Sequence, residues 1–134
     1  MIDYQFTNNF EIRDYECDLQ GIVNNAVYQH YLEHTRHLFL KQKGIDFTAL
    51  AEKGINLVVI RVEIYYIYLL MSRDHFSVGI NLERVSRLRF GFFQDIYRLP
   101  DNKTILKSKV IVTSVSKNGR PYELKVMGEL MESF

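Results

Sequence analysis

A change in the spacing of apolar residues near Asn56 is the feature that most constrains the fold of this chain. Before it, residues 24–43 carry apolar side chains at intervals of three and four, which is typical of an amphipathic helix. After it, residues 58–65 alternate in period two, which predicts a long strand with one apolar face. Three further strands are predicted in the same way, at 76–83, 88–99 and 104–116.

Shorter signals complete the outline. Residues 4–14 predict a first strand, and Gly44 marks the end of the long helix. A short helix is expected between Asp46, as its cap, and Gly54. The sequence of the tail, 121–133, favours neither a strand nor a short helix.

Together these elements predict an α+β domain that spans residues 1–134. Connections of hairpin length make the four later strands antiparallel, and the single long helix must cover one face of their sheet. We therefore expect one long helix packed in a curved antiparallel sheet of about five strands. The open edges and faces of such a sheet usually pair with a second subunit.

Composition excludes several classes of function. The 17 basic and 16 acidic residues nearly cancel, so no overall field attracts nucleic acid or an anionic membrane. The apolar stretch 57–71 is interrupted by Arg61 and Glu63 and is not a membrane span. Cys17 is alone, and the N-terminus lacks the pattern of a signal peptide, so we expect a cytoplasmic protein.

The most conspicuous local motif is His30-x-x-Glu33-His34, which has the order of a zinc-peptidase motif. With His37, these histidines fall on one side of the predicted helix, away from its apolar stripe. A catalytic zinc also needs a further protein ligand in fixed geometry, and His75 opens a strand elsewhere. We therefore interpret the histidines as a polar flank and expect no metal, with a zinc protein as the alternative.

The reactive residues are expected just before the start of this helix. Asp18 lies in a polar loop, and the helix begins within a few residues of it. Gly21, between them, permits another group to approach the backbone closely. A carboxylate can act as nucleophile or general base, while the unpaired N–H groups of a helix start can polarise a carbonyl. These parts suit attack on an acyl carbonyl. The alternative is that Asp18 only caps the helix or turns the loop.

A longer pattern, D-x-x-G-I-V-x-x-x-x-Y-x-x-Y-x-E-x-x-R, runs through this region and is occupied by Asp18, Gly21, Ile22, Val23, Tyr28, Tyr31, Glu33 and Arg36. It resembles the signature of the 4-hydroxybenzoyl-CoA thioesterase family of hotdog-fold proteins. Residues 62–76, with Tyr66 and Asp74, are similar to the second long strand of that family and the turn after it. The resemblance covers about residues 5–120.

The resemblance implies a role for particular residues. Asp18 matches the catalytic carboxylate of the family, and the backbone N–H of Asn25 matches the donor to the thioester carbonyl. Further substrate contacts are expected from Gly21, Ile22, Val23, Asn24, Tyr28 and Tyr66. The family places its sites between subunits, so a homodimer or homotetramer is expected.

Two arginines are expected to bind coenzyme A, the group that carries the acyl chain. Arg87 and Arg89 fall near the position where relatives bind the phosphates of coenzyme A. Two residues apart on a strand, they would project to one face, as paired phosphate contacts require. A solvated strand face is the alternative.

One departure from the family leaves the carrier open. Many acyl-CoA relatives have an aromatic residue and a histidine where this chain has Asn24 and Asn25. The segment 23–28, "VNNAVY", instead resembles acyl-carrier-protein thioesterases of the same fold. The substrate is therefore expected to be an acyl-CoA, with an acyl-ACP as the alternative.

The sequence thus predicts a thioesterase that needs no cofactor. Three alternatives from other classes are a hotdog dehydratase, a non-catalytic acyl-thioester-binding protein and a structural domain without a ligand. The His-Phe-Pro pattern of one dehydratase group is absent, because the only prolines are Pro100 and Pro121.

Overall fold

The computed structural model describes residues 3–121, and the predicted order of elements is confirmed within them. The elements are β1 (Phe6–Glu11), the 3₁₀ turn η1 (Asp14–Glu16), α1 (Asn25–Gln42), α2 (Phe47–Glu52), β2 (Asn56–Tyr66), β3 (His75–Arg84), β4 (Arg89–Leu99) and β5 (Lys103–Val115). The first strand is shorter at both ends than the predicted range 4–14, and η1 begins at the last residue of that range. The tail beyond residue 121 lies outside the described residues.

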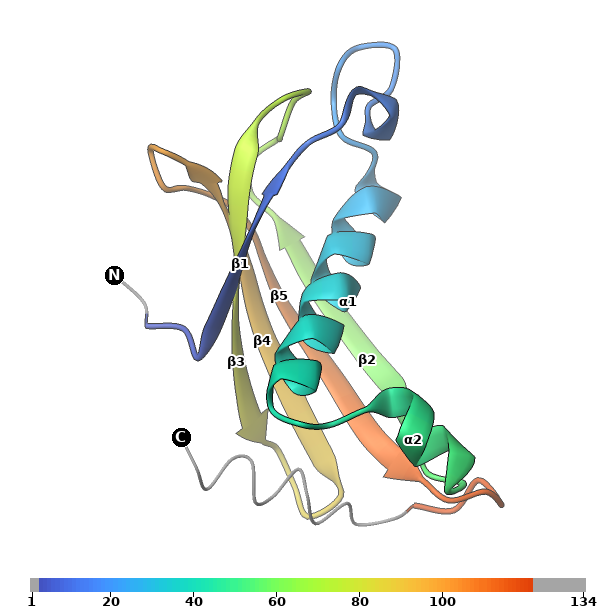
Figure 1. Cartoon of the computed structure of the whole chain (residues 1–134). Coiled ribbons are helices and arrows are strands. Elements are labelled where there is room, and N and C mark those ends of the chain that lie inside the picture. The colour runs from blue at the N-terminus through green and yellow to red at the C-terminus, as the bar shows by residue number, and fades with distance from the viewer. Residues whose placement is uncertain (1–2, 122–134) are drawn as a thin grey trace.

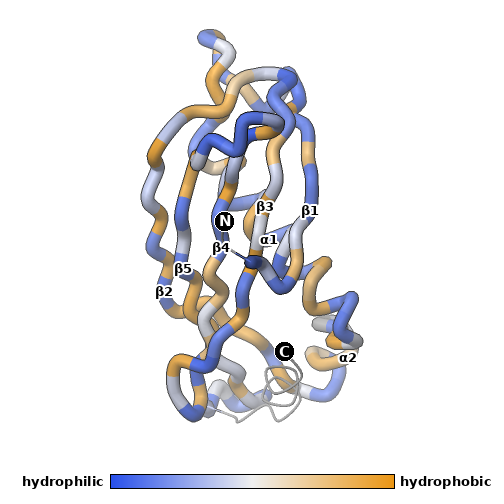
Figure 2. The backbone as a smooth tube through the Cα atoms, turned by 90° about the vertical axis from the view of Figure 1, so that its left-hand side faces the viewer, coloured by the Kyte–Doolittle hydropathy of each residue, from blue (hydrophilic) through white to orange (hydrophobic). Residues whose placement is uncertain are grey.

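The five strands form one antiparallel sheet in the order β1-β3-β4-β5-β2 (Figure 2). The predicted hairpins β3–β4 and β4–β5 are confirmed. A hairpin between β2 and β3 was also expected, and this expectation is wrong, because β2 pairs with β5 at the edge of the sheet. The eight residues 67–74 instead cross the ends of β5 and β4. Three strand spacings are only about 14 Å, which eight extended residues span easily.

Helix α1 lies across one face of this sheet, as predicted (Figure 1). Its buried residues are Tyr28, Tyr31, Leu32, Thr35, Phe39 and Leu40. The spacing of apolar residues also predicts burial of Leu38, which is only half-buried, and does not predict burial of Leu40, which is fully buried. The cause is the turn after the helix, where Gly44 has a φ of 83° and the Ile45 amide donates to the Leu40 carbonyl. This turn folds the chain back over Leu40.

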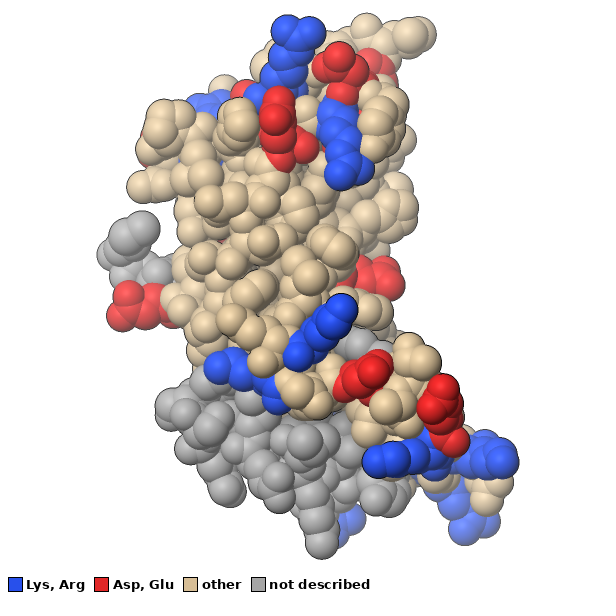
Figure 3. All heavy atoms as spheres, in the orientation of Figure 1, with Lys and Arg blue, Asp and Glu red and all other residues tan. Residues whose placement is uncertain are grey.

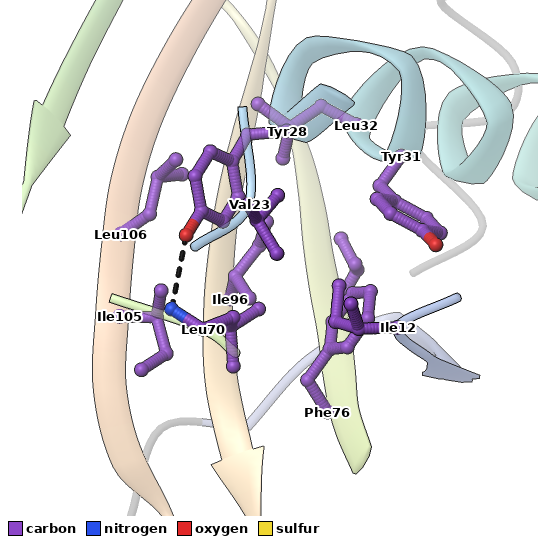
Figure 4. Packing of buried hydrophobic residues seen from close by; sticks show 11 residues of the cluster. Ile12, Val23, Tyr28, Tyr31, Leu32, Leu70, Phe76, Ile96, Ile105 and Leu106 are labelled. Carbon is purple, nitrogen blue, oxygen red and sulfur yellow. Dashed lines mark hydrogen bonds between the residues drawn. The ribbon is translucent and has the colours of Figure 1, made fainter. Parts of the chain in front are cut away.

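The core between α1 and the sheet consists of two clusters of buried residues. One surrounds Phe39 near the C-terminal end of α1. The other includes Tyr28, Leu70 and Phe76 and lies beneath the loop that precedes α1 (Figure 4). This second cluster supports the loop that carries Asp18.

The edge strand β2 has an apolar and exposed surface. Val59 is 46% exposed and Val62 is 45% exposed, and Val58 and Ile60 are exposed to a similar extent. Solvent-exposed edges are normally protected by charge or by a partner. Among residues 3–121, no helix is long and apolar enough to cross a membrane.

Candidate active site

The loop that carries Asp18 is a tight hairpin of its own. Cys17 and Val23 form an antiparallel bridge, and the Asp18 amide donates to the Ile22 carbonyl at 2.9 Å. Gly21 closes the turn with a φ of 77°, a left-handed conformation that favours glycine, and its amide donates to the Asp18 carbonyl at 3.0 Å. These bonds hold Asp18 opposite the residues that lead directly into α1.

The carboxylate of Asp18 is exposed and is oriented by backbone donors. One of its oxygens, Oδ1, accepts hydrogen bonds from the amides of Gln20 at 2.8 Å and Ile22 at 3.2 Å. The arrangement is compatible with both sequence interpretations, because Asp18 turns the loop and also leaves its carboxylate exposed in the hairpin that leads into α1.

The first turn of α1 offers a preset donor. Asn24 is the N-cap, and its side chain accepts from the Ala26 amide at 3.0 Å, while its carbonyl accepts from the Val27 amide at 2.9 Å. The N–H of Asn25, the first residue of the helix, has no acceptor among residues 3–121. An N–H at a helix start carries partial positive charge, so it suits a carbonyl oxygen that gains negative charge.

Tyr28 lies beneath the Asp18 loop and links α1 to the segment 67–74. Its side chain is buried, and its hydroxyl oxygen accepts a hydrogen bond from the Leu70 amide at 3.0 Å (Figure 4). Burial raises the pKa of Tyr28, so the phenol is neutral at physiological pH. The ring lies 5.8 Å from the half-exposed ring of Tyr66 at the end of β2. The structure thus places Tyr28 and Tyr66, two of the residues expected to contact the substrate, next to each other.

The crossing segment 67–74 completes the support of the loop. The Val23 amide donates to the Leu70 carbonyl at 3.2 Å, and the Ser72 amide donates to the Gly21 carbonyl at 3.3 Å. The side chain of Asp74 accepts from the Met71 amide and so closes the turn of this segment. The sequence prediction missed these contacts because it treated the segment as a simple hairpin.

Glu16 is a further positioning residue that the sequence prediction did not include. Its carboxylate accepts from the Tyr31 hydroxyl at 2.5 Å and from the Arg13 amide at 2.9 Å. Its carbonyl accepts from the Asn24 amide at 3.2 Å. Burial and the bond to Glu16 raise the pKa of Tyr31. Glu16 therefore ties η1 to the start of α1, a role that nothing in the spacing of the sequence indicates.

The basic pair Arg87 and Arg89 does not join this site within one chain. β3 begins beside the Asp18 loop and ends at Arg84, so the turn to β4 lies about 30 Å away along the strand. Figure 3 shows charged side chains gathered toward the two ends of the molecule. The expectation that both arginines share a strand is wrong, because β4 begins at Arg89 and Arg87 lies in the turn.

The histidines of α1 lie on its exposed face, as predicted. His30, His34 and His37 are all exposed, and His37 lies 3.8 Å from Glu33. The His34 ring contacts Phe10 of β1 at 6.0 Å. Within the described range, no three His, Cys, Asp or Glu side chains form a group that could hold a metal ion.

Comparison with known proteins assigns the family. The sequence matches the thioesterase-like superfamily over residues 12–129, which is most of its length. The chain belongs to this superfamily. Among relatives of this thioesterase-like chain, a chloroplastic acyl-acyl carrier protein thioesterase of Arabidopsis thaliana is 35% identical over 114 residues, which is 85% of this chain and 60% of the relative. The chain thus spans less than two thirds of that relative's length.

Solved structures confirm the hotdog architecture of the thioesterase-like chain. A 1,4-dihydroxy-2-naphthoyl-CoA thioesterase from Synechocystis superposes with a TM-score of 0.91, 12% identity and 96% coverage of both chains. A hypothetical protein from Aquifex aeolicus superposes with a TM-score of 0.83 and 28% identity, covering 95% of this chain and 97% of that one. The predicted resemblance to hotdog thioesterases is therefore confirmed at the level of family and fold.

Proposed function

We propose that this chain hydrolyses acyl thioesters, with water and the thioester giving a carboxylic acid and a free thiol. The observation that carries the proposal is the position of Asp18, which two backbone amides orient beside the start of α1. The family supports the same reaction class. An acyl thioester placed there would meet a carboxylate on one side and a helix donor on the other.

In the proposed reaction, the Asn25 N–H donates to the carbonyl oxygen of the thioester. Negative charge that develops on this oxygen is stabilised by a donor already in place. Asp18 acts either as the nucleophile, through an anhydride that water then cleaves, or as the base that activates water. In both routes the carbon–sulfur bond breaks and the thiolate leaves with a proton from water.

The site is proposed to be completed by a second copy of the chain. Asp18 is exposed, and the residues beside its loop include exposed apolar side chains, such as Ile67 at 50% and Met71 at 54%. A reaction site normally excludes water around its charged groups. The apolar edge strand β2 supports pairing of subunits, and a homodimer is the simplest arrangement, with a homotetramer as the alternative.

Arg87 and Arg89 fit this proposal only as contributions from a partner. Within one chain they lie at the far end of the sheet from Asp18. A carrier that extends from one subunit's Asp18 toward the neighbouring subunit would bring its phosphates to that end of the partner. Both side chains are exposed and available for such contacts.

Two carriers are proposed, acyl-CoA and acyl-ACP. The Arabidopsis relative is an acyl-acyl carrier protein thioesterase, and the pair Asn24 and Asn25 in this chain supports that carrier. The Synechocystis structure is a thioesterase for an aromatic acyl-CoA, and the exposed rings at Tyr66 and Tyr68 are compatible with an acyl or aromatic group.

The test is thiol release from matched substrates. The same acyl groups (short, long and aromatic) are presented as CoA and as ACP thioesters to the purified wild-type chain. Turnover of one carrier form at least tenfold faster identifies the carrier. Tight binding of both forms without thiol release would contradict the proposed reaction and favour a non-catalytic acyl-thioester-binding protein.

A further inference from the structure

The end of the molecule opposite the Asp18 loop carries an excess of positive charge. Three segments close this end: the end of α2 (52–54), the β3–β4 turn with its flanks (84–89) and the turn after β5 (117–120) (Figure 1). They contain one carboxylate, Glu52, and six cations. The cations are Lys53, Arg84, Arg87, Arg89, Lys117 and Arg120, and all six are exposed. We call this surface the basic end.

Contacts between the segments make the basic end one continuous surface. Lys117 lies directly against the end of α2, because a Cβ on Gly54 would be only 3.2 Å from the Cβ of Lys117. The hydroxyl of Thr113 in β5 donates to the Leu88 carbonyl at 2.8 Å and so joins the β3–β4 turn to β5. From β3 to β2 the surface is three strand spacings wide, which is about 14 Å.

Nearby carboxylates do not neutralise these cations. Among residues 3–121, no carboxylate forms an ion pair with any of the six. The carboxylate of Asp46 is occupied in capping α2, where it accepts from the Thr48 amide at 2.9 Å. Glu52 and Glu83 are exposed. The positive charge of the basic end is therefore open to a partner from outside the chain.

The Asp18 end has the opposite excess. Its segments 11–18, 73–74 and 98–103 contain six carboxylates and four cations. The whole chain has a net charge of only +1, so the difference between the two ends is local. A partner with an acidic surface would be attracted to the basic end and repelled from the Asp18 end.

The spread of the cations favours a protein over a small anion. A phosphate group is bound by donors that converge on one point. Here the cations are distributed over three segments, and the guanidinium of Arg84 is held at its own turn, where it donates to the Arg87 carbonyl at 2.8 Å. A wide front of exposed, unpaired cations suits the steering and docking of an acidic protein surface.

We propose that the basic end docks an acyl carrier protein through acidic side chains of the carrier, so that the substrate is an acyl-ACP. The inference rests on the proposed function, which supplies the reaction, and it names the carrier. The basic end lies about 30 Å from Asp18 of the same chain. In the proposed pairing of subunits, a carrier docked on one subunit therefore delivers its acyl group to the Asp18 of the other.

The first test measures binding of a holo acyl carrier protein that bears no acyl group. The double variant Lys53→Glu with Arg120→Glu reverses two charges on the side of the basic end near α2. Its dissociation constant for the carrier protein is expected to be at least about tenfold higher than that of the wild type. Free coenzyme A, measured in parallel by calorimetry, is expected to bind both proteins equally.

A second variant tests the width of the surface. Arg87→Glu reverses a charge in the β3–β4 turn, on the other side of the basic end, and is expected to weaken binding of the carrier protein as well. Lys107→Glu is the matched control, because it makes the same change of charge at an exposed position of β5 outside the basic end. Circular dichroism checks that each variant folds.

Four results would each overturn the proposal. They are a wild type that does not bind the carrier protein, a folded double variant that binds it like the wild type, equal weakening in Lys107→Glu, and an effect confined to one side of the basic end. Equal loss of coenzyme A binding in the double variant would also contradict it, because these cations would then bind a phosphate. A carrier without an acyl group cannot be hydrolysed, so absence of hydrolysis would contradict only the proposed function.

Discussion

At the scale of single residues, the proposed site depends on hydrogen bonds between residues that lie close together in the sequence. Asp18 is oriented by the amides of its own loop, and Asn24 caps the helix that supplies the proposed donor. The buried hydroxyl of Tyr28 accepts a hydrogen bond from the Leu70 amide and so supports the segment beneath the loop. The groups proposed to react are therefore positioned by hydrogen bonds to the backbone.

Tyr28→Phe is expected to destabilise the protein although the ring is kept. The Leu70 N–H would lose its acceptor in a buried position, which costs about 1–3 kcal/mol. Urea unfolding of the variant and the wild type measures this difference in the free energy of unfolding. Tyr4→Phe is the control for removal of a tyrosine hydroxyl in a less buried position. Equal stability of Tyr28→Phe and wild type would contradict the proposed anchoring of the crossing segment.

At the scale of helices and strands, the features that the sequence predicted correctly are those set by residues close together in the chain. The spacing of apolar residues gave α1 and the four later strands, and the pairing at β3–β4 and β4–β5 followed from short turns. The position of Asp18 in a turn shortly before the helix was also predicted, with Gly21 as a local signal, but the cap proves to be Asn24, whereas the sequence interpretation had considered Asp18 for that role.

Long-range contacts were not predictable in this way. Periodicity does not specify which strand β2 pairs with, so the crossing of residues 67–74 and its bonds to Gly21 and Val23 were missed. The burial of Leu40 depends on the turn at Ile45, and the role of Glu16 depends on a contact with Tyr31 across 15 positions of the chain. Each of these features is set by tertiary structure and has no local pattern.

Asn24→Ala is expected to weaken the start of α1. The Ala26 amide would lose the side-chain acceptor that now caps it, which costs about 1 kcal/mol of stability. A lower midpoint of thermal unfolding measures the effect. Asn24→Ser keeps a capping oxygen and should retain most of the stability. If Ala and Ser were equally stable at this position, the cap would not contribute as described.

At the scale of the whole molecule, several features point beyond a single chain. The edge strand β2 exposes valines, and Asp18 is open to solvent. Arg87 and Arg89 lie at the opposite end of the sheet from the Asp18 of the same chain. The proposed pairing of two subunits is compatible with these observations.

If the proposed dimer forms through β2, Val62→Lys is expected to shift it toward the monomer. The added charge would lie on the exposed apolar edge, where burial against a second subunit would be costly. Light scattering after size separation measures the mass in solution. Lys107→Ala, a change of an exposed residue within the sheet, provides a control that should leave the mass unchanged. A dimeric Val62→Lys variant would exclude β2 from the interface.

The most direct test of the central claim compares turnover of an acyl thioester by the wild type and by Asp18→Asn. The amide has nearly the same shape but cannot act as nucleophile or base, so turnover is expected to fall at least about a hundredfold. The fold and the mass in solution should remain those of the wild type. A folded Asp18→Asn variant with turnover close to that of the wild type would contradict the proposed role of Asp18.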